Sequence, residues 1–247
     1  MKMKWLFSVL ALAITTSSFA EAEAQATTTW QTKIDAALNK FENRRQLDWS
    51  FTVKGFEDEE GEVTQQIETY QPAETIEASW TLVEVNGEAP SEERLKDYYE
   101  RKRKRFEEAQ EQAEEQDGEQ EQSFSIIIRD LIIFDTLKLD SETETHSILS
   151  FDVNFDQRGI DAGDALTGKL FYDKKGAYID RMEITNVESF SPAFSADIEK
   201  FSIAFAFQQI EKVVLPTLMS MNLEGTYAFF ADIKEVSEVR YEDYRLK

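Results

Sequence analysis

The sequence contains no cysteine, and this absence excludes several kinds of site at once. Without thiols the chain has no disulfide framework, no cysteine nucleophile and no cysteine-based metal centre. Proline and glycine are also scarce, with four and nine residues among 247. Stability must therefore come from an apolar core, and a chain of this length is long enough to bury one in a single domain.

Histidine is nearly absent as well, because His146 is the one imidazole in the chain. A single histidine cannot build the usual imidazole metal site, and neither G-x-S-x-G nor H-E-x-x-H occurs in the sequence. As a general base, His146 would need a partner that orients it. We therefore predict no catalytic residue, no enzymatic activity and no cofactor.

Acidic oxygen ligands are plentiful, but their spacing does not form a recognised metal loop. Asp152, Asn154 and Asp156 resemble the start of a calcium loop. Such a loop requires glycine where Gln157 stands and glutamate where Gly163 stands. We predict no metal site here. The alternative is that the following turn supplies oxygen ligands to a metal ion, from Asp156, Asp161 and Asp164.

Positive charge is in short supply. The chain has 49 acidic and 27 basic residues, a net charge of −22. A surface this acidic repels nucleic acid and anionic lipid headgroups at long range. We expect no nucleic-acid partner, whereas basic partners would suit this charge.

The N-terminal residues have the three regions of a secretory signal. Lys2 and Lys4 are followed by the apolar run Trp5 to Ile14, and then by the small-x-small sequence Ser18-Phe19-Ala20. The run is short of the roughly 20 apolar residues that a spanning helix needs. We predict that residues 1–20 are a signal peptide cleaved near Ala20. The mature chain, residues 21–247, is then a single periplasmic domain with no membrane span.

Alternating apolar and polar residues predict β-strands that bury one face. The pattern is regular in two segments, which contain Leu149, Phe151, Val153 and Phe155, and Phe201, Ile203, Phe205 and Phe207. Trp49, Phe51 and Val53 alternate in the same way. Helical spacing from Trp30 to Arg45, with Thr28 or Thr29 as N-cap, predicts a helix laid against the sheet.

Turn residues separate the remaining strands. Asp58-Glu59-Glu60-Gly61 and Asp173-Lys174-Lys175-Gly176 each suit a type I turn between two strands. The two hairpins are either a weak repeat or independent units. A strand over residues 76–85 is expected to end at Asn86-Gly87, and Pro216 predicts a sheet edge or a bulge.

Residues 90–122 predict a long charged helical insertion, with Ser91 as N-cap. Its basic cluster is Arg101, Lys102, Arg103, Lys104 and Arg105. Such a cluster either binds an acidic partner or forms one solvated helix face neutralised by nearby glutamates. The complete prediction is an α+β fold: a single antiparallel, strongly curved sheet in the form of an open half-barrel, an N-terminal helix and the charged insertion.

The order of parts from Trp30 to Gly87 resembles a known family. An amphipathic helix leads into Trp49-Ser50-Phe51-Thr52-Val53, a DxxG hairpin, Tyr70-Gln71-Pro72 and Trp80-Thr81-Leu82. This is similar to the periplasmic lipoprotein carriers of the LolA/LolB type, and to uncharacterised exported proteins of Gram-negative bacteria. The resemblance implies an open half-barrel whose concave apolar face holds acyl chains beneath helices. The insertion at residues 90–122 departs from that family.

Two functional hypotheses follow. The first is binding of a lipid or other apolar ligand on the concave face, lined by Trp49, Phe51, Phe151, Phe155, Phe201, Phe205 and Phe207. The alternative interpretation of the same residues is that they only pack the core. The second hypothesis is an envelope protein-interaction module that uses the helix over residues 91–116 and its basic cluster, with no small ligand.

Overall fold

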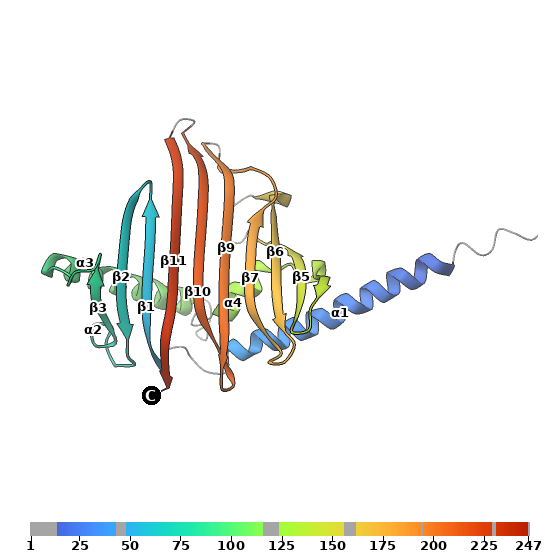
Figure 1. Ribbon diagram of the computed structural model, residues 1–247, viewed down its shortest axis with the longest axis horizontal. Coiled ribbons are helices and arrows are strands. Elements are labelled where there is room, and N and C mark those ends of the chain that lie inside the picture. The colour runs from blue at the N-terminus through green and yellow to red at the C-terminus, as the bar shows by residue number, and fades with distance from the viewer. Residues whose placement is uncertain are drawn as a thin grey trace, which may run out of the picture.

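The computed structural model describes residues 14–42, 48–115, 124–155, 162–193, 195–228 and 231–246 (Figure 1). It confirms the α+β fold, with one open antiparallel sheet of 11 strands. The helices are α1 (Ile14–Glu42), α2 (Ile76–Ser79), α3 (Glu92–Glu115) and α4 (Phe124–Leu131). The strands are β1 (Trp49–Glu59), β2 (Glu62–Tyr70), β3 (Trp80–Val85), β4 (Lys138–Glu142), β5 (His146–Asp152), β6 (Leu166–Asp173), β7 (Tyr178–Asn186), β8 (Phe190–Ala193), β9 (Ala196–Ile210), β10 (Val213–Tyr227) and β11 (Ala231–Leu246).

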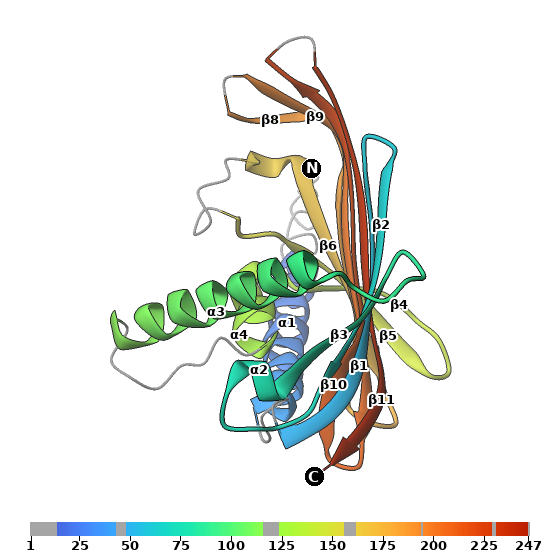
Figure 2. The same ribbon diagram turned by 90° about the vertical axis from the view of Figure 1, so that its left-hand side faces the viewer.

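The C-terminal strand lies in the middle of the sheet. The strand order is β3-β2-β1-β11-β10-β9-β7-β6-β5-β4, and β8 pairs with β9 outside this path. Strand β11 therefore joins the N-terminal hairpin β1-β2 to the rest of the sheet. Figure 2 shows α1, α3 and α4 on the same side of the sheet. We call this side the inner face and the opposite side the outer face.

Helix α1 is longer than its sequence pattern predicts. The apolar stripe of Trp30, Ile34, Leu38 and Phe41 is buried, which confirms the packing against the sheet. The helix begins at Ile14, however, so the expected N-cap at Thr28 or Thr29 is wrong. No proline or glycine interrupts residues 14–28, and their alanines and glutamates favour continuation of a helix. The expected helix end at Arg45 lies outside the described residues.

The buried residues form two separate cores. The first lies between α1, α4 and strands β5 to β9, and includes Ile34, Leu38, Leu149, Leu170, Ile179 and Met182. The second lies over the β1-β2 half and contains Trp49, Phe51, Val53, Tyr70, Val213 and Leu215. Val214 belongs to the first core although both its neighbours belong to the second. The two cores therefore meet at this end of β10.

Two local predictions are wrong: the start of a strand at residue 76 and the turn type of the first hairpin. Residues 76–79 form the short helix α2 instead of a strand, because Thr75 caps it by accepting from the Ala78 N–H at 3.2 Å. The turn at Glu60-Gly61 has positive φ at both residues, +52° and +92°, and is a type I′ turn instead of type I. Two-residue loops of this type match the twist of the paired strands. The loop after Asp173 holds four residues, so the two hairpins differ in construction.

Other local predictions are confirmed. Ser91 Oγ accepts from the Arg94 N–H at 3.2 Å and caps α3. Asn86 and Gly87 form the expected turn, with φ of +51° and +81°. The register between β9 and β10 shifts between Pro216 and Leu218, so proline marks a bulge within a central strand. Within the described ranges, no helix combines the length and apolarity that a membrane crossing requires.

Candidate functional site

The seven aromatic residues predicted to line a ligand face do not gather at one open surface. Phe151, Phe155, Phe205 and Phe207 lie in the first core, whereas Trp49 and Phe51 lie in the second. Phe201 is the partly buried member of the set. The split follows from the strand order, because β11 and β10 stand between β1 and β9.

Ring contacts account for the burial of these residues. The Phe41 ring of α1 meets Phe207 edge-on, with centroids 4.8 Å apart. Phe51 stacks on Tyr70 at 5.0 Å and contacts Trp80 edge-on at 5.9 Å. Aromatic pairs in these geometries stabilise a core beyond the effect of their buried area. Most of the predicted ligand residues therefore pack the fold.

A different set of apolar residues is only partly buried on the inner face. This inner band consists of Phe201 and Ile203 from β9, Met219, Met221 and Leu223 from β10, and Val239 from β11. Met219 is 36% exposed. Phe201 and Ile203 adjoin the first core, whereas Val239 adjoins the second. The inner band therefore connects the two cores across the middle of the sheet.

Strand register places the inner band on the face that carries the helices. Met219 pairs with Phe205 on one side and with Val239 on the other, and Met221 pairs with Ile203. Phe205 is buried in the first core beneath α1. Paired residues of an antiparallel ladder point to the same face, so the methionines share the face of Phe205.

Polarity changes along two rows of paired residues on the inner face. The row through Leu223 continues from Phe201 to Glu235, Glu59 and Glu62. The next row continues from Ile203 and Met221 to Ser237 and Glu57. We call Glu57, Glu59, Glu62 and Glu235 the acidic rim. In these two rows the inner face thus passes from apolar on β9 and β10 to polar and acidic on β11, β1 and β2.

The acidic rim differs from the acids of the outer face. On the outer face Glu224 lies 2.8 Å from Lys200, Glu238 lies 2.6 Å from Arg240, and Glu242 lies 2.6 Å from Lys54. None of the four rim glutamates has an ion pair with another described residue. The acidic rim therefore places four glutamates without a basic partner among the described residues beside the inner band.

A buried charged cluster fixes the helical insertion to the sheet. Glu68 of β2 is 5% exposed, and its Oε2 accepts from the Tyr98 hydroxyl at 2.8 Å. Lys102 Nζ lies 2.7 Å from the same oxygen and 3.5 Å from the centre of the Trp80 ring. Gln66 donates to the other carboxylate oxygen at 2.8 Å. Both oxygens of the buried carboxylate thus have hydrogen-bond donors, as such a group requires.

Burial shifts the pKa of two groups in this cluster. Loss of solvent lowers the pKa of the Lys102 ammonium, although the nearby Glu68 carboxylate opposes that shift. Burial raises the pKa of the Tyr98 phenol, and the negative charge of Glu68 raises it further. The cluster therefore holds a neutral phenol and an ion pair together beneath α3.

The predicted basic cluster is divided by this arrangement. Lys102 points to Glu68, Arg103 lies 3.4 Å from Glu77, and Lys104 forms a loose pair with Glu108 at 3.6 Å. Arg101 and Arg105 are exposed. The five residues do not form one basic surface.

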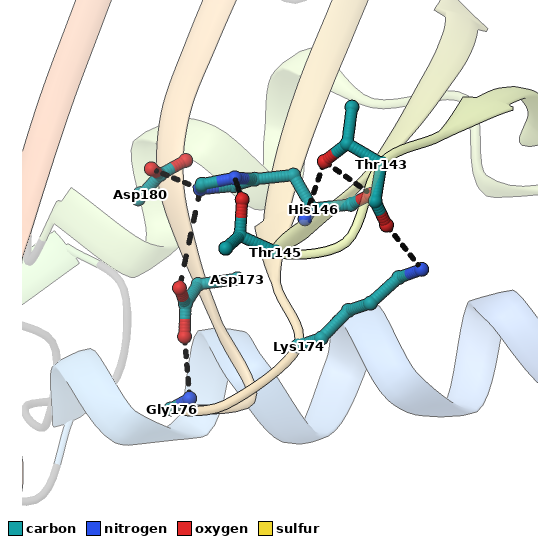
Figure 3. Close-up of polar contacts among 7 residues, drawn as sticks. All are labelled: Thr143, Thr145, His146, Asp173, Lys174, Gly176 and Asp180. Carbon is teal, nitrogen blue, oxygen red and sulfur yellow. Dashed lines mark hydrogen bonds and ion pairs between the residues drawn. The ribbon is translucent and has the colours of Figure 1, made fainter.

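The histidine has hydrogen-bonding neighbours at both ring nitrogens (Figure 3). His146 Nε2 lies 2.7 Å from an Asp180 carboxylate oxygen, and Nδ1 lies 2.8 Å from the Thr145 hydroxyl. Asp173 is farther away, at 3.9 Å, and accepts from the Gly176 N–H in its own turn. Because both nitrogens are engaged within the protein, this geometry leaves no ring nitrogen directed at a substrate.

A cleft of about 370 Å³ lies beside this histidine, lined by His146, Phe171, Asp180, Arg181, Ala206 and Phe207. The guanidinium of Arg181 lies 3.9 Å from the centre of the Phe171 ring, and both side chains line the cleft. Within the described residues, the second Asp180 oxygen is buried and has no hydrogen-bond partner. The cleft is lined by residues of β5, β6, β7 and β9, and its polar side chains come from β5 and β7.

The described part of the chain contains no group of three or more side chains suited to a metal ion. Of the alternative acidic turn, Asp156 and Asp161 lie outside the described residues, and Asp164 is exposed. The prediction that the chain needs no metal stays a prediction.

Sequence reasoning missed the open part of the inner face and the cluster around Glu68. The alternation of Met219, Met221 and Leu223 was visible as a strand pattern. Nothing local distinguished these residues from Phe205 and Phe207, which have the same period and are buried. No local sequence pattern indicated that Glu68 is buried, because its partners Tyr98 and Lys102 are far away in the sequence.

Comparison with known proteins yields little. No protein-family model matches the chain, and no curated protein sequence matches it significantly. Among solved structures, the chain is similar to the crystal structure of a DUF1329 family protein from Desulfovibrio piger at 1.75 Å resolution. The two share 9% sequence identity with a TM-score of 0.29, and the match covers 87% of this chain and 93% of that one. This is a weak relationship of fold.

Proposed function

We propose that this protein binds a lipid or another apolar ligand along the inner band. The observation that carries the proposal is the partial exposure of Met219, Met221 and Leu223 on the face that carries the helices, beside two packed cores. Methionine side chains are flexible and polarisable, and they suit binding surfaces that accommodate apolar chains of varied shape. A partly exposed apolar band of this kind is a feature of ligand grooves.

The size of the inner band sets the strength of binding. From Met219 to Leu223 it extends about 13 Å along the strand, and β9 and β10, at about 4.8 Å each, give it a width of about 10 Å. Covering that area on both protein and ligand would gain at most about 6 kcal/mol at 25 cal/mol per Å², because the band residues are already partly buried. Association costs at least about 4 kcal/mol, so the band alone supports weak, reversible binding. Such binding suits a carrier or sensor that must release its ligand.

Two sequence features support this proposal. The signal predicted over residues 1–20 would place the protein in the periplasm, where apolar molecules need carriers through an aqueous compartment. The segment from Trp30 to Gly87 resembles the LolA/LolB carriers, whose half-barrel holds acyl chains on its concave face.

The test compares inner and outer positions of one strand. The variant Met219→Gln/Met221→Gln keeps side-chain length but adds amides to the inner band. Ser220→Gln, on the outer face between them, is the matched control. Binding of the neutral fluorophore N-phenyl-1-naphthylamine, displaced by dodecanol, is measured by fluorescence.

We expect the double variant to bind at least tenfold more weakly and Ser220→Gln to bind like the wild type. Circular dichroism must show that both variants remain folded. Absence of binding to the wild-type protein, or equal losses in both variants, would contradict the proposal.

A second candidate is protein interaction through α3. Phe106 is 49% exposed, close in sequence to the exposed Arg101 and Arg105, and α3 extends away from the sheet in Figure 2. The variant Arg101→Glu/Arg105→Glu/Phe106→Ser should then lose cross-linking to an envelope protein that the wild type captures. Retained cross-linking would mean that α3 serves only the fold.

A further inference from the structure

We propose that the ligand of the inner band is a cationic amphiphile, whose apolar chain lies on the band and whose amine or other basic head lies at the acidic rim. This inference rests on the proposed function and adds the chemistry of the ligand head. It follows from three features of the inner face: the adjacency of band and rim, the lack of counter-charges, and the pairing of the acids with one another.

The adjacency is given by the strand register. Leu223 of the inner band is the direct partner of Glu235, and Glu235 is the direct partner of Glu59. Neighbouring strands lie about 4.8 Å apart, so the carboxylates begin one strand beyond the end of the apolar surface. A molecule lying across this row meets apolar side chains first and carboxylates next. That order matches a chain with a cationic head.

Like charges oppose one another directly within the rim. Glu59 pairs with Glu62 across the hairpin and with Glu235 on the other side. Directly opposed like charges destabilise a sheet, because their side chains lie close together. Glu224, Glu238 and Glu242 of the outer face each have a basic partner, whereas the rim acids have none among the described residues. A basic group from a ligand would supply the missing counter-charge.

The net negative charge of the protein disfavours binding of anionic amphiphiles. At a net charge of −22, a fatty acid or another anionic amphiphile is repelled before it reaches the band. An uncharged amphiphile gains the apolar contact only. The rim therefore selects among ligands that share the same chain.

The experiment uses three probes of equal chain length: dodecylammonium, dodecanol and dodecanoate. Each is measured below its micelle concentration at pH 7, by displacement of N-phenyl-1-naphthylamine from the full mature chain. We expect dodecylammonium to bind about tenfold more tightly than dodecanol, and dodecanoate to bind more weakly than either. High salt should reduce the advantage of the ammonium, because exposed charges are screened.

The variant Glu59→Gln/Glu62→Gln/Glu235→Gln tests the rim. It should reduce the preference for dodecylammonium to less than about threefold while leaving dodecanol binding unchanged. The control Glu224→Gln/Glu238→Gln/Glu242→Gln removes the same amount of charge from the outer face and should keep the preference. Unchanged dodecanol binding also shows that the rim variant is folded.

The outcomes separate the two proposals. If none of the probes binds, the proposed function itself is wrong. If all bind without a preference for the ammonium, or if the outer-face control loses the preference equally, the rim inference alone is wrong. A dimer in sedimentation that the Met219→Gln/Met221→Gln variant dissociates would show that a second copy covers the band, and would overturn both.

Discussion

Lys102 of helix α3 and Glu68 of strand β2 form an ion pair of 2.7 Å beneath the helical insertion. The carboxylate side chain is 6% exposed and the lysine side chain 20%, so water screens this pair little. Tyr98 donates to the same carboxylate oxygen. The insertion is therefore attached to the sheet through a buried charge and is part of the folded domain.

Replacing Lys102 by methionine should destabilise the protein by about 2–3 kcal/mol, because it leaves the Glu68 carboxylate buried without its cation. Lys104→Met is the control: Lys104 is exposed, and loss of its pair with Glu108 should cost less than about 1 kcal/mol. Urea denaturation measures both. Adding Glu68→Gln to Lys102→Met should recover part of the loss, since the uncompensated charge is then gone. A double variant less stable than Lys102→Met would refute this account.

Stability should fall above about pH 10. Burial raises the pKa of Tyr98, Tyr172, Tyr178 and Tyr241 above the ordinary value of 10.0. In the unfolded chain these phenols lose their protons near pH 10, whereas in the folded state they keep them. Their stabilising contribution is therefore complete below pH 10 and decreases as the pH rises, by at most about 1.4 kcal/mol per unit for a phenol that stays protonated in the folded state.

Tyr98→Phe isolates one of these groups. Its stability, measured by urea denaturation between pH 8 and 11, should decrease less steeply than that of the wild type. The exposed Tyr227, changed to phenylalanine, serves as the control. The lowered pKa of Lys102 acts in the opposite direction, because the folded state loses that proton first as the pH rises. The lysine effect ends near the ordinary lysine pKa of 10.5, so a wild-type stability that still increases above that pH would contradict the account of the tyrosines.

Gly168→Ala should destabilise the first core by about 1–3 kcal/mol, as overpacking does. A Cβ at Gly168 would lie 2.1 Å from Cζ of the Phe151 ring, its cross-strand partner. Gly55→Ala is the control, since the nearest atom there is 3.1 Å away on the flexible Gln66 side chain. Thermal unfolding compares the two. Phe151→Leu combined with Gly168→Ala should recover some stability if the ring is the cause, and no recovery would point to a backbone effect.

We predict that the protein is exported and that its mature form begins at Glu21. Figure 1 shows the N-terminal half of α1 extending beyond the sheet, and its described buried side chains begin at Trp30. Removal of residues 1–20 should therefore leave the unfolding free energy unchanged within about 0.5 kcal/mol. Intact-mass measurement on a periplasmic fraction checks the cleavage. Ser18→Arg/Ala20→Arg should block it, and retention of residues 1–20 in the wild type would exclude the predicted signal.

Local patterns in the sequence determined the elements and the faces of this protein. The alternation from Phe201 to Phe207 predicts a strand with one apolar face, because side chains of a strand alternate with a period of two. Ser91 and Asn86-Gly87 mark a helix start and a turn for equally local reasons, a side-chain cap and residues that tolerate positive φ. These signals depend on residues within a few positions of one another, so they are readable without the fold.

Tertiary structure decided which apolar residues are covered and which charges are buried. Phe205 and Met219 are paired and share a face, but Phe205 lies in the first core whereas Met219 is 36% exposed. The placement of β11 beside β1 creates both the separation of the cores and the acidic rim. In the sequence, Lys102 is indistinguishable from the other charges of a solvated helix. Only the fold places it beside Glu68 of β2. Coverage and charge pairing depend on contacts between residues far apart in the chain, which a local pattern does not encode.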